Sequence, residues 1–321
     1  MKLRILSDLH LYINRKYPLE IPNNYDFTLI AGDIGPEYKK NVEWIKKNIH
    51  KGAFISGNHD AYTFDYTPIE DVKEYYHKEF PLESEITYFD YDVGVISKEI
   101  DDNLLLVADV LYTDYEMKCF DWDSDLSVEQ LIEHNKKRAS PKMSGSYMND
   151  FGYVTKNKEF SNGVHHFHNK NYYYLTPNWY LNHFKKSFNE INKIVEENSN
   201  KEIILMTHHC LSPQCCSQWM DKGILTASYI SDKEEWIKQH NNIKLIISGH
   251  IHNVKEFYIG DTLYVMNPLG YCRENHDIIN KWTPDFFVDT KTWKIQKNSY
   301  NNIVWEKEHN DEPLSKFLNI F

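Results

Sequence analysis

Five short clusters of Asp, Asn and His, each placed directly after a compact apolar run, constrain what this chain can fold into more than any other feature. The clusters are Asp8-Leu9-His10, Gly32-Asp33, Gly57-Asn58-His59-Asp60, His208-His209 and Gly249-His250-Ile251-His252. In an open α/β sheet, ligands bind in the crevice beyond the carboxyl ends of the strands. If each apolar run is a strand, the five clusters meet at one edge of the fold although they lie far apart in the sequence.

The segments around these clusters alternate between strand-like and helical patterns. We expect strands at Arg4–Ser7, Phe27–Ala31, Ala53–Ser56, Glu202–Met206 and Lys244–Ile247, and short antiparallel strands at Val254–Tyr258, Thr262–Met266, Phe286–Asp289 and Lys294–Asn298. We expect helices at Tyr38–Asn48, Thr67–Phe80, Thr176–Glu197 and Ser231–His240, the last opened by a capping box of Ser231 and Glu234. This rhythm predicts a largely parallel, buried sheet with helices on its faces.

Composition and charge exclude several classes of protein. The 321 residues are 41% hydrophobic and 26% charged, which is typical of a globular protein rather than a disordered or fibrous one. No apolar run approaches the roughly 18–20 residues of a membrane helix, and Asp8 comes too early for a signal peptide, so we expect a cytoplasmic protein without membrane contact. Five cysteines without paired spacing predict reduced thiols. A net charge of −11 argues against a protein that holds long nucleic acid on its surface.

One long segment, Tyr112–Leu175, interrupts two halves that otherwise read as parts of one fold. It is rich in aromatic and polar residues, contains one predicted helix at Ser127–Arg138, and is too long for an ordinary connection. We therefore expect a single domain over residues 1–321 with an inserted cap over the site at about 112–175. The alternative is a peripheral decoration remote from the chemistry.

The side chains in the clusters form a characteristic set of metal ligands. Imidazole combined with carboxylate and amide oxygen suits Zn, Mn or Fe better than Ca or Mg. Asp-x-His and His-x-His on an extended segment point both side chains to the same face, so each pair can hold one ion. The glycines at 32, 57 and 249 allow the sharp turns that bring such ligands together.

The ordered pattern D-x-H, G-D, G-N-H-[DE], H and G-H-x-H resembles that of the calcineurin-like metallophosphoesterase superfamily. All five blocks are intact between Asp8 and His252, which is most of the chain. The resemblance implies a four-layer αββα sandwich of two mixed sheets with an inserted cap segment.

The chain resembles most a subset of uncharacterised bacterial and phage phosphoesterases in that superfamily. The shared marks are Tyr112-Thr113-Asp114, Met148-Asn149-Asp150 and Asn267-Pro268-Leu269-Gly270-Tyr271. That subset commonly carries a basic residue at the position of Leu269. Arg273 is the substitute that we consider here for phosphate binding.

The resemblance implies a site for two divalent transition-metal ions, which could be Mn, Fe, Zn or Ni. The residues it assigns to the first ion are Asp8, His10 and His252, and those it assigns to the second are Asn58, His208 and His250. Asp33 would bridge them, and two ions about 3.5–4 Å apart do require a shared ligand of this kind. Two such ions against two carboxylates leave a charge of +2, which attracts an anionic phosphoester.

The expected reaction is attack on phosphorus by a hydroxide that bridges the two ions. His59 would protonate or stabilise the leaving oxygen. Asp60 would either orient His59 or cap the turn. His209 would either face the substrate or pack in the interior.

We therefore predict a hydrolase of small phosphomonoesters or phosphodiesters, with nucleotides as the leading substrate hypothesis and long nucleic acid as a disfavoured one. Three alternatives stay open: a nuclease like the double-strand-break repair exonucleases, a protein Ser/Thr phosphatase, and a non-enzymatic scaffold. The phosphatase pattern G-D-x-x-D-R-G is not met by Gly32-Asp33-Ile34-Gly35-Pro36-Glu37, and a scaffold typically lacks the histidine at His59. The sequence does not predict the oligomeric state.

Overall fold

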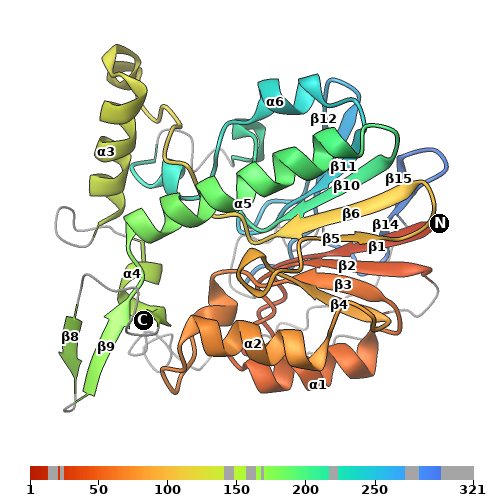
Figure 1. Cartoon of the computed structure of the whole chain (residues 1–321), viewed down its shortest axis with the longest axis horizontal. Helices are drawn as coiled ribbons and strands as arrows, with labels where there is room; N and C mark the ends of the chain where they lie inside the picture. Colours follow the sequence, from red (N-terminus) through yellow and green to blue (C-terminus); the bar gives the residue numbers. More distant parts are fainter. Residues whose placement is uncertain are drawn as a thin grey trace, which may run out of the picture.

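The computed structural model of the chain describes residues 1–13, 21, 25–140, 148–156, 164–167, 170–216, 223–271 and 282–297. Within these residues, two six-stranded sheets pack face to face and helices cover their outer faces (Figure 1). The predicted four-layer sandwich of two mixed sheets is confirmed.

The first sheet has the strand order β15-β14-β1-β2-β3-β4. Its strands are β1 Lys2–Leu6, β2 Phe27–Ala31, β3 Gly52–Ile55, β4 Ile86–Phe89, β14 Phe286–Asp289 and β15 Lys294–Lys297. Strands β1 to β4 are parallel, and β14 and β15 are antiparallel to their neighbours.

The second sheet has the order β12-β13-β11-β10-β6-β5. Its strands are β5 Ser97–Glu99, β6 Leu104–Asp109, β10 Glu202–Thr207, β11 Ile243–Ile247, β12 Lys255–Ile259 and β13 Thr262–Met266. The inner four strands are parallel and the two edge strands are antiparallel. β4, β5 and β6 are not among the strands that the sequence predicted.

Three apolar cores hold the layers together. Helices α1 Tyr38–Asn48 and α2 Ile69–Glu79 pack on the first sheet, and α5 Pro177–Glu197 and α6 Glu234–Gln239 pack on the second (Figure 1). A third core, which includes Ile5, Leu29 and Met206, lies between the sheets. Alternate residues of a strand face opposite sides, so strands covered on both faces are largely apolar. The runs Leu104–Ala108 of β6 and Ile203–Met206 of β10 have this character.

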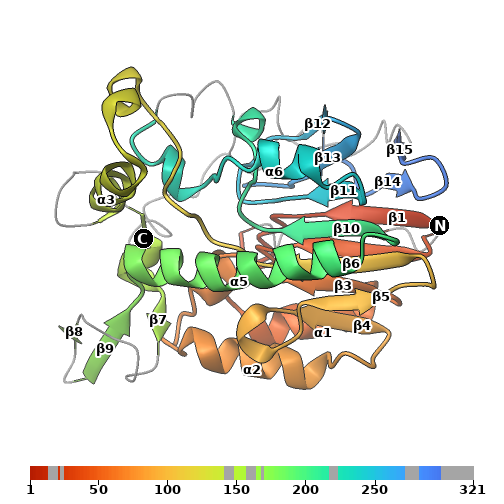
Figure 2. The same cartoon turned by 45° about the horizontal axis from the view of Figure 1, so that its top comes forward.

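The segment from 112 to 175 forms its own small structure beyond the carboxyl ends of the strands. It contains α3 Val128–Ala139, α4 Asp150–Tyr153 and a three-stranded sheet of β7 Thr155–Lys156, β8 Val164–Phe167 and β9 Lys170–Tyr174. Figures 1 and 2 show these elements at the same end of the molecule, where β6 and β10 end. Five short 3₁₀ helices lie in the described loops: His59–Ala61, Tyr91–Val93, Asp121–Asp125, Pro213–Cys215 and Thr226–Ser228.

Two predicted helix starts differ from the structure, and the first is that of α2, which begins at Ile69 with Pro68 at its N-cap position rather than at Thr67. The Thr176 hydroxyl accepts from Trp179 N at the start of α5, and Ser127 and Gln130 form a capping box at the start of α3. The predicted capping box at Ser231 is wrong, because α6 begins at Glu234 and the Ser231 hydroxyl instead accepts a hydrogen bond from Asp114 N. The hydrogen bond of Ser231 with the loop after β6 thus takes the place of the predicted helix cap.

Two further expectations concern the whole chain. None of the helices in the described ranges is long and apolar enough to cross a membrane. Of the five cysteines, Cys119, Cys210, Cys215 and Cys216 are free and buried, and Cys272 lies outside the described residues.

Candidate metal centre

The predicted ligands lie where strands end, and the backbone there is unusual. Asp8, His10, Asp33 and His250 all have positive φ, at 51°, 41°, 55° and 66°. Non-glycine residues in this region cost on the order of 1–3 kcal/mol each, and they persist where the surrounding structure demands them. Each of these four predicted ligands therefore has a left-handed backbone conformation, which directs its side chain back across the ends of the strands.

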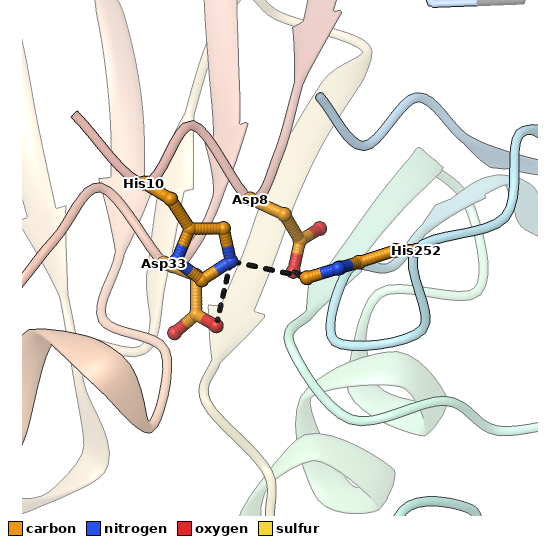
Figure 3. Close-up of side chains that lie close together, drawn as sticks. All are labelled: Asp8, His10, Asp33 and His252. Carbon is orange, nitrogen blue, oxygen red and sulfur yellow. Dashed lines mark hydrogen bonds and ion pairs between the residues drawn. The ribbon is translucent and has the colours of Figure 1, made fainter. Parts of the chain in front are cut away.

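The first group of ligands consists of Asp8, His10, Asp33 and His252, whose ligand atoms lie within 4.8 Å of one another (Figure 3). The His10 and His252 Nε2 atoms are 3.0 Å apart. His252 Nε2 is 3.6 Å from Asp8 Oδ1, and His10 Nε2 is 3.7 Å from Asp33 Oδ2. Carboxylate oxygens and imidazole nitrogens thus converge on one point.

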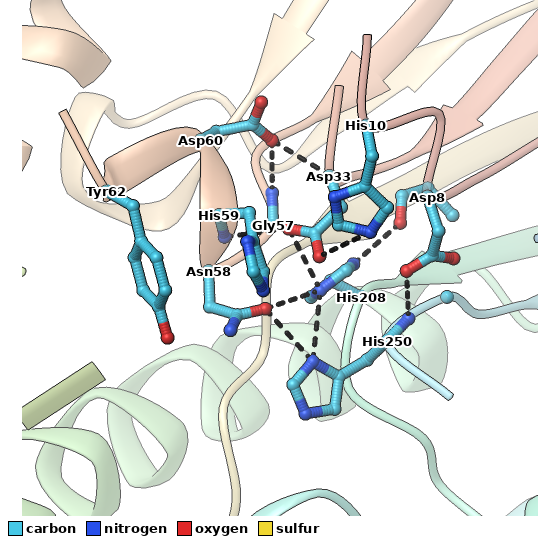
Figure 4. Close-up of polar contacts among 12 residues, drawn as sticks. Asp8, His10, Asp33, Gly57, Asn58, His59, Asp60, Tyr62, His208 and His250 are labelled. Carbon is cyan, nitrogen blue, oxygen red and sulfur yellow. Dashed lines mark hydrogen bonds and ion pairs between the residues drawn. The ribbon is translucent and has the colours of Figure 1, made fainter. Parts of the chain in front are cut away.

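The second group consists of Asp33, His208 and His250, joined by the amide of Asn58 (Figure 4). Asn58 Oδ1 lies 3.0 Å from both His208 Nε2 and His250 Nδ1. The His208 Nδ1–H donates to the Ala31 carbonyl at 2.8 Å, and because a carbonyl only accepts, His208 Nε2 keeps a free lone pair. This is the tautomer that a metal ligand needs.

Asp33 stands between the two groups and contributes one oxygen to each. Its Oδ2 faces His10 Nε2 at 3.7 Å, and its Oδ1 lies 3.4 Å from His208 Nε2. All seven predicted metal ligands, Asp8, His10, Asp33, Asn58, His208, His250 and His252, are therefore brought together in two adjoining groups.

The electrostatics of the buried cluster fit a cationic occupant. Burial, together with the carboxylates of Asp8 and Asp60, raises the pKa of Asp33 well above its ordinary value. Burial and neighbouring imidazoles lower the pKa of His10 and of His250, so both are neutral and able to bind metal at neutral pH. Asp8 Oδ2 is buried and, within the described residues, has no hydrogen-bond donor. A divalent cation would satisfy each of these groups.

Close backbone approach at two glycines makes this geometry possible. A Cβ on Gly57 would meet Asp33 N at 2.5 Å and His208 Cε1 at 2.6 Å, and a Cβ on Gly249 would meet Ala31 O at 2.6 Å. Real Cβ atoms essentially never come within 3.0 Å of such atoms. The glycines in these motifs therefore leave room for ligands rather than merely allowing a turn.

The predicted catalytic histidine, His59, borders both groups without joining either set of ligand atoms. Its Nε2 lies 3.0 Å from the Tyr271 hydroxyl, and its Nδ1 lies 3.3 Å from the Tyr12 hydroxyl. The His59 ring packs edge-on against the His10 ring at 4.8 Å. Burial, with repulsion from His252 and His208, lowers the pKa of His59 to about 3, so the ring is neutral at neutral pH.

Asp60 holds the loops together. Its carboxylate accepts from Gly57 N at 2.7 Å, Asp33 N at 3.0 Å and Gly35 N at 2.9 Å (Figure 4). The hydroxyls of Tyr12 and Tyr271, and not Asp60, contact the His59 ring. These contacts favour the turn-capping alternative for Asp60 over orientation of His59.

The two predicted substrate-binding residues have different outcomes. His209 is fully buried and stacks on the ring of His250 at 4.3 Å, so it packs behind the ligand and does not face a substrate. Its peptide N–H points back to the Val110 carbonyl at the end of β6. These contacts favour the alternative in which His209 packs in the interior. Arg273 lies outside the described residues.

Three polar residues next to the ligands were not assigned a role from the sequence. Asp150 and Tyr271 belong to segments that carry the resemblance, but only the fold shows that Asp150 contacts Asn58 and that Tyr271 contacts His59. Tyr12 lies in no recognised block. The only sequence feature that could have pointed to Tyr12 as a neighbour of the site is its position two residues after the Asp-x-His motif.

A third acidic and histidine cluster, Asp90, Asp92 and His183, is already neutralised by a side chain. The buried Lys73 ammonium lies 3.0 Å from Asp90 Oδ2 and 2.6 Å from Asp92 Oδ2. A metal ion there would be repelled by this ammonium. The cluster is an ion-pair network that ties α2 to the turn after β4.

Comparison with known proteins identifies a family model and solved structures that this chain resembles. The family model described as calcineurin-like phosphoesterase matches residues 1–254. No curated protein matches the sequence significantly. Among solved structures, phosphopantetheinyl hydrolase from Mycobacterium tuberculosis is similar with a TM-score of 0.61 and 14% identity, over 86% of this chain and 94% of that one.

A candidate 5′-nucleotidase from Staphylococcus aureus is similar with a TM-score of 0.40 and 11% identity. That likeness spans 83% of this chain and 48% of the other.

Proposed function

This chain belongs to the calcineurin-like phosphoesterase family, and on that premise we propose that it hydrolyses small phosphoesters at a site for two divalent transition-metal ions. Mn, Fe, Zn and Ni all suit its mixed oxygen and nitrogen ligands. Nucleotides are the substrates that we propose to test first. Long nucleic acid is a poor candidate, because the chain carries a net charge of −11.

The observation that carries this proposal is the position of Asp33. One of its oxygens faces the Asp8, His10 and His252 group, and the other faces the Asn58, His208 and His250 group. When bound, two divalent ions supply a nucleophilic hydroxide at neutral pH and neutralise charge on the phosphoryl oxygens. The residues of the chain then have to hold the ligand atoms in place, orient the substrate and assist the leaving group.

His59 is the residue that we propose for the leaving group. It adjoins the ligands, and phenol hydroxyls contact both of its ring nitrogens. A neutral imidazole carries one N–H, and the hydroxyls of Tyr12 and Tyr271 bias which nitrogen bears it. In this proposal that N–H donates a hydrogen bond to the leaving oxygen and stabilises the negative charge that develops there as the phosphorus–oxygen bond breaks.

We propose that the segment from 112 to 175 is a cap belonging to the same single domain. Its residue Asp150 contacts the ligand Asn58, and its elements lie beyond the carboxyl ends of the strands (Figure 2). A cap at this place would limit the site to small or single-ended phosphoesters.

The test is a substrate panel with metal-loaded protein. Protein loaded with Mn²⁺ would be assayed against a nitrophenyl monoester, a nitrophenyl diester, mononucleotides, cyclic nucleotides and duplex DNA. We expect hydrolysis of at least one small phosphoester, faster than degradation of duplex DNA, and loss of activity when a chelator removes the metal. Faster degradation of long duplex DNA would favour the nuclease alternative, and inactivity on every substrate with metal bound would favour the scaffold.

Two variants make the assay specific to the proposed site. Asp33→Asn removes the bridging carboxylate and should lower both the metal content and the activity. Asp261→Asn, in the exposed turn between β12 and β13, makes the same chemical change away from the ligands and should alter neither. Unchanged metal content in Asp33→Asn would overturn the bridging assignment.

A further inference from the structure

Asp150, in the segment between the two halves of the fold, is buried against the metal ligand Asn58. Its side chain is fully enclosed and lies at the first residue of α4. Its Oδ1 accepts a hydrogen bond from Asn58 Nδ2 at 2.9 Å and another from the Tyr62 hydroxyl. Its Oδ2 accepts from the Tyr180 hydroxyl at 2.6 Å. All three donors are neutral groups, so none of them cancels the charge of the carboxylate.

This contact decides which way the Asn58 amide faces. An ionised carboxylate only accepts hydrogen bonds, so the Asn58 atom next to Asp150 has to be the NH₂ group. The carbonyl Oδ1 is thereby directed to the opposite side, where it lies 3.0 Å from both His208 Nε2 and His250 Nδ1 (Figure 4). Rotating the amide would place its NH₂ among ligand atoms and its oxygen against a carboxylate.

The same contact tunes the ligand electronically. A carboxylate that accepts from the amide N–H increases the negative charge on the amide oxygen, as carboxylates do for histidines that bind metals. Asp150 also comes from a segment more than ninety residues away from Asn58 in the sequence. Through this hydrogen bond the segment from 112 to 175 contacts a predicted metal ligand directly.

We propose that Asp150 is a positioning residue that fixes the Asn58 amide for the second metal ion and makes binding of that ion depend on the inserted segment. This inference rests on the proposed function, because it requires two ions at the site. Asp150 itself contacts neither the metal nor the substrate. The anchoring hydroxyls of Tyr62, next to the Gly57–Asp60 turn, and Tyr180, in the first turn of α5, hold the carboxylate in place.

Stepwise metal binding to the full chain tests the proposal, with Mn²⁺ as the probe and electron paramagnetic resonance as the readout. Asp150→Asn keeps the shape of the side chain and removes its charge. We expect it to weaken binding of the second ion about 10–100-fold and to leave the first ion unaffected. A purely structural residue would lower the melting temperature without acting on one ion selectively.

Asp123→Asn is the matched control. Asp123 is also a buried aspartate of the inserted segment, but it is paired with Arg138 at 2.8 Å and not with a ligand. This variant should lower the melting temperature and keep both ions at native affinity. Equal loss of the second ion in the two variants would overturn the proposal, because general damage to the segment would then explain both.

A paired variant keeps the proposal testable if Asp150→Asn does not fold. Asn58→Asp combined with Asp150→Asn exchanges the carboxylate and the amide, so that residue 58 still presents an oxygen and residue 150 donates to it. This pair should recover binding of the second ion.

Native binding of both ions by Asp150→Asn, or failure of the folded pair to bind the second ion, overturns the role of Asp150 while leaving the proposed function intact. A native protein that binds two ions but hydrolyses no phosphoester overturns the proposed function alone. A native protein that binds no second ion overturns both.

Discussion

Replacing Gly57 by alanine should disable the metal centre through a steric effect that can be calculated from the structure. A Cβ at this position would lie 2.5 Å from Asp33 N and 2.6 Å from His208 Cε1, with Asp33 Oδ1 nearer still. Ordinary contact begins at 3.4 Å, so two ligands of the second group have to retreat by about 1 Å. Metal–ligand distances are tolerated only to about ±0.2 Å. The displacement is therefore several times larger than a bound ion can accommodate.

Two magnitudes follow from this displacement. Overpacking a well-packed interior costs about 1–3 kcal/mol, so the variant should still fold. Loss of a hydrogen bond to a metal ligand typically lowers metal affinity about 10–100-fold. Moving the ligands themselves out of position should lower the affinity at least as much. We expect Gly57→Ala to show native circular dichroism, a modestly lower melting temperature, and a loss of metal affinity of that order or more in a Mn²⁺ titration.

Gly94→Ala provides the control for the general cost of adding a methyl group. Gly94 has φ of +74° and no heavy atom within 4 Å of an added Cβ, so the variant suffers backbone strain and no collision. It should lose about 1–2 kcal/mol of stability and keep both ions at native affinity. A folded Gly57→Ala protein that binds metal as tightly as the native chain would refute the steric reasoning and the placement of Asp33 and His208 on which it rests.

Three further predictions concern other parts of the molecule. His59→Ala should retain metal but lose activity by about 10²–10⁴-fold, and the loss should shrink for nitrophenyl esters, whose leaving oxygen needs little stabilisation. Equal losses on good and poor leaving groups would exclude a role of His59 at the leaving oxygen. Lys73→Met should lower the free energy of unfolding by about 3–5 kcal/mol in urea titrations, because the buried Asp90 carboxylate is left without its ammonium partner. A loss below about 1 kcal/mol would contradict a stabilising ion pair between Lys73 and Asp90. Burial lowers the pKa of Lys73, but its aspartates outweigh this effect and raise the pKa well above the ordinary 10.5. The contribution of the Lys73 ion pairs to the free energy of unfolding should therefore be complete below about pH 10.5 and be lost as the pH rises further. Lys73→Met should not show this loss.

The ligand clusters could be predicted from the sequence because each one is a local pattern. A single Asp-x-His or Gly-His-x-His is not specific, but five such clusters in order, each after a compact apolar run, are very hard to obtain by accident. Parallel strands bring such clusters to one edge whatever their separation in the sequence. The bridging role of Asp33 came from the resemblance to the phosphoesterase superfamily and stays a prediction. The structure adds the left-handed backbone at Asp8, His10, Asp33 and His250, which no residue type reveals except glycine.

Other features depend on contacts between distant segments and could not be predicted. The burial of His209 behind His250 depends on Tyr112 and Tyr180, whose rings lie 5.3 and 5.8 Å from it. Strand β5 was missed because it has only three residues, too few for the alternation that identifies a strand. The contact of Asp150 with Asn58 has no local signature at all.

Anomalous diffraction from crystals grown with Mn²⁺ is the most direct test of the account. The proposal predicts two anomalous peaks in each chain, about 3.5–4 Å apart, one among Asp8, His10 and His252 and the other among Asn58, His208 and His250. Asp33 should have one carboxylate oxygen on each ion. A single peak, or two peaks of which only one contacts Asp33, would contradict the central claim.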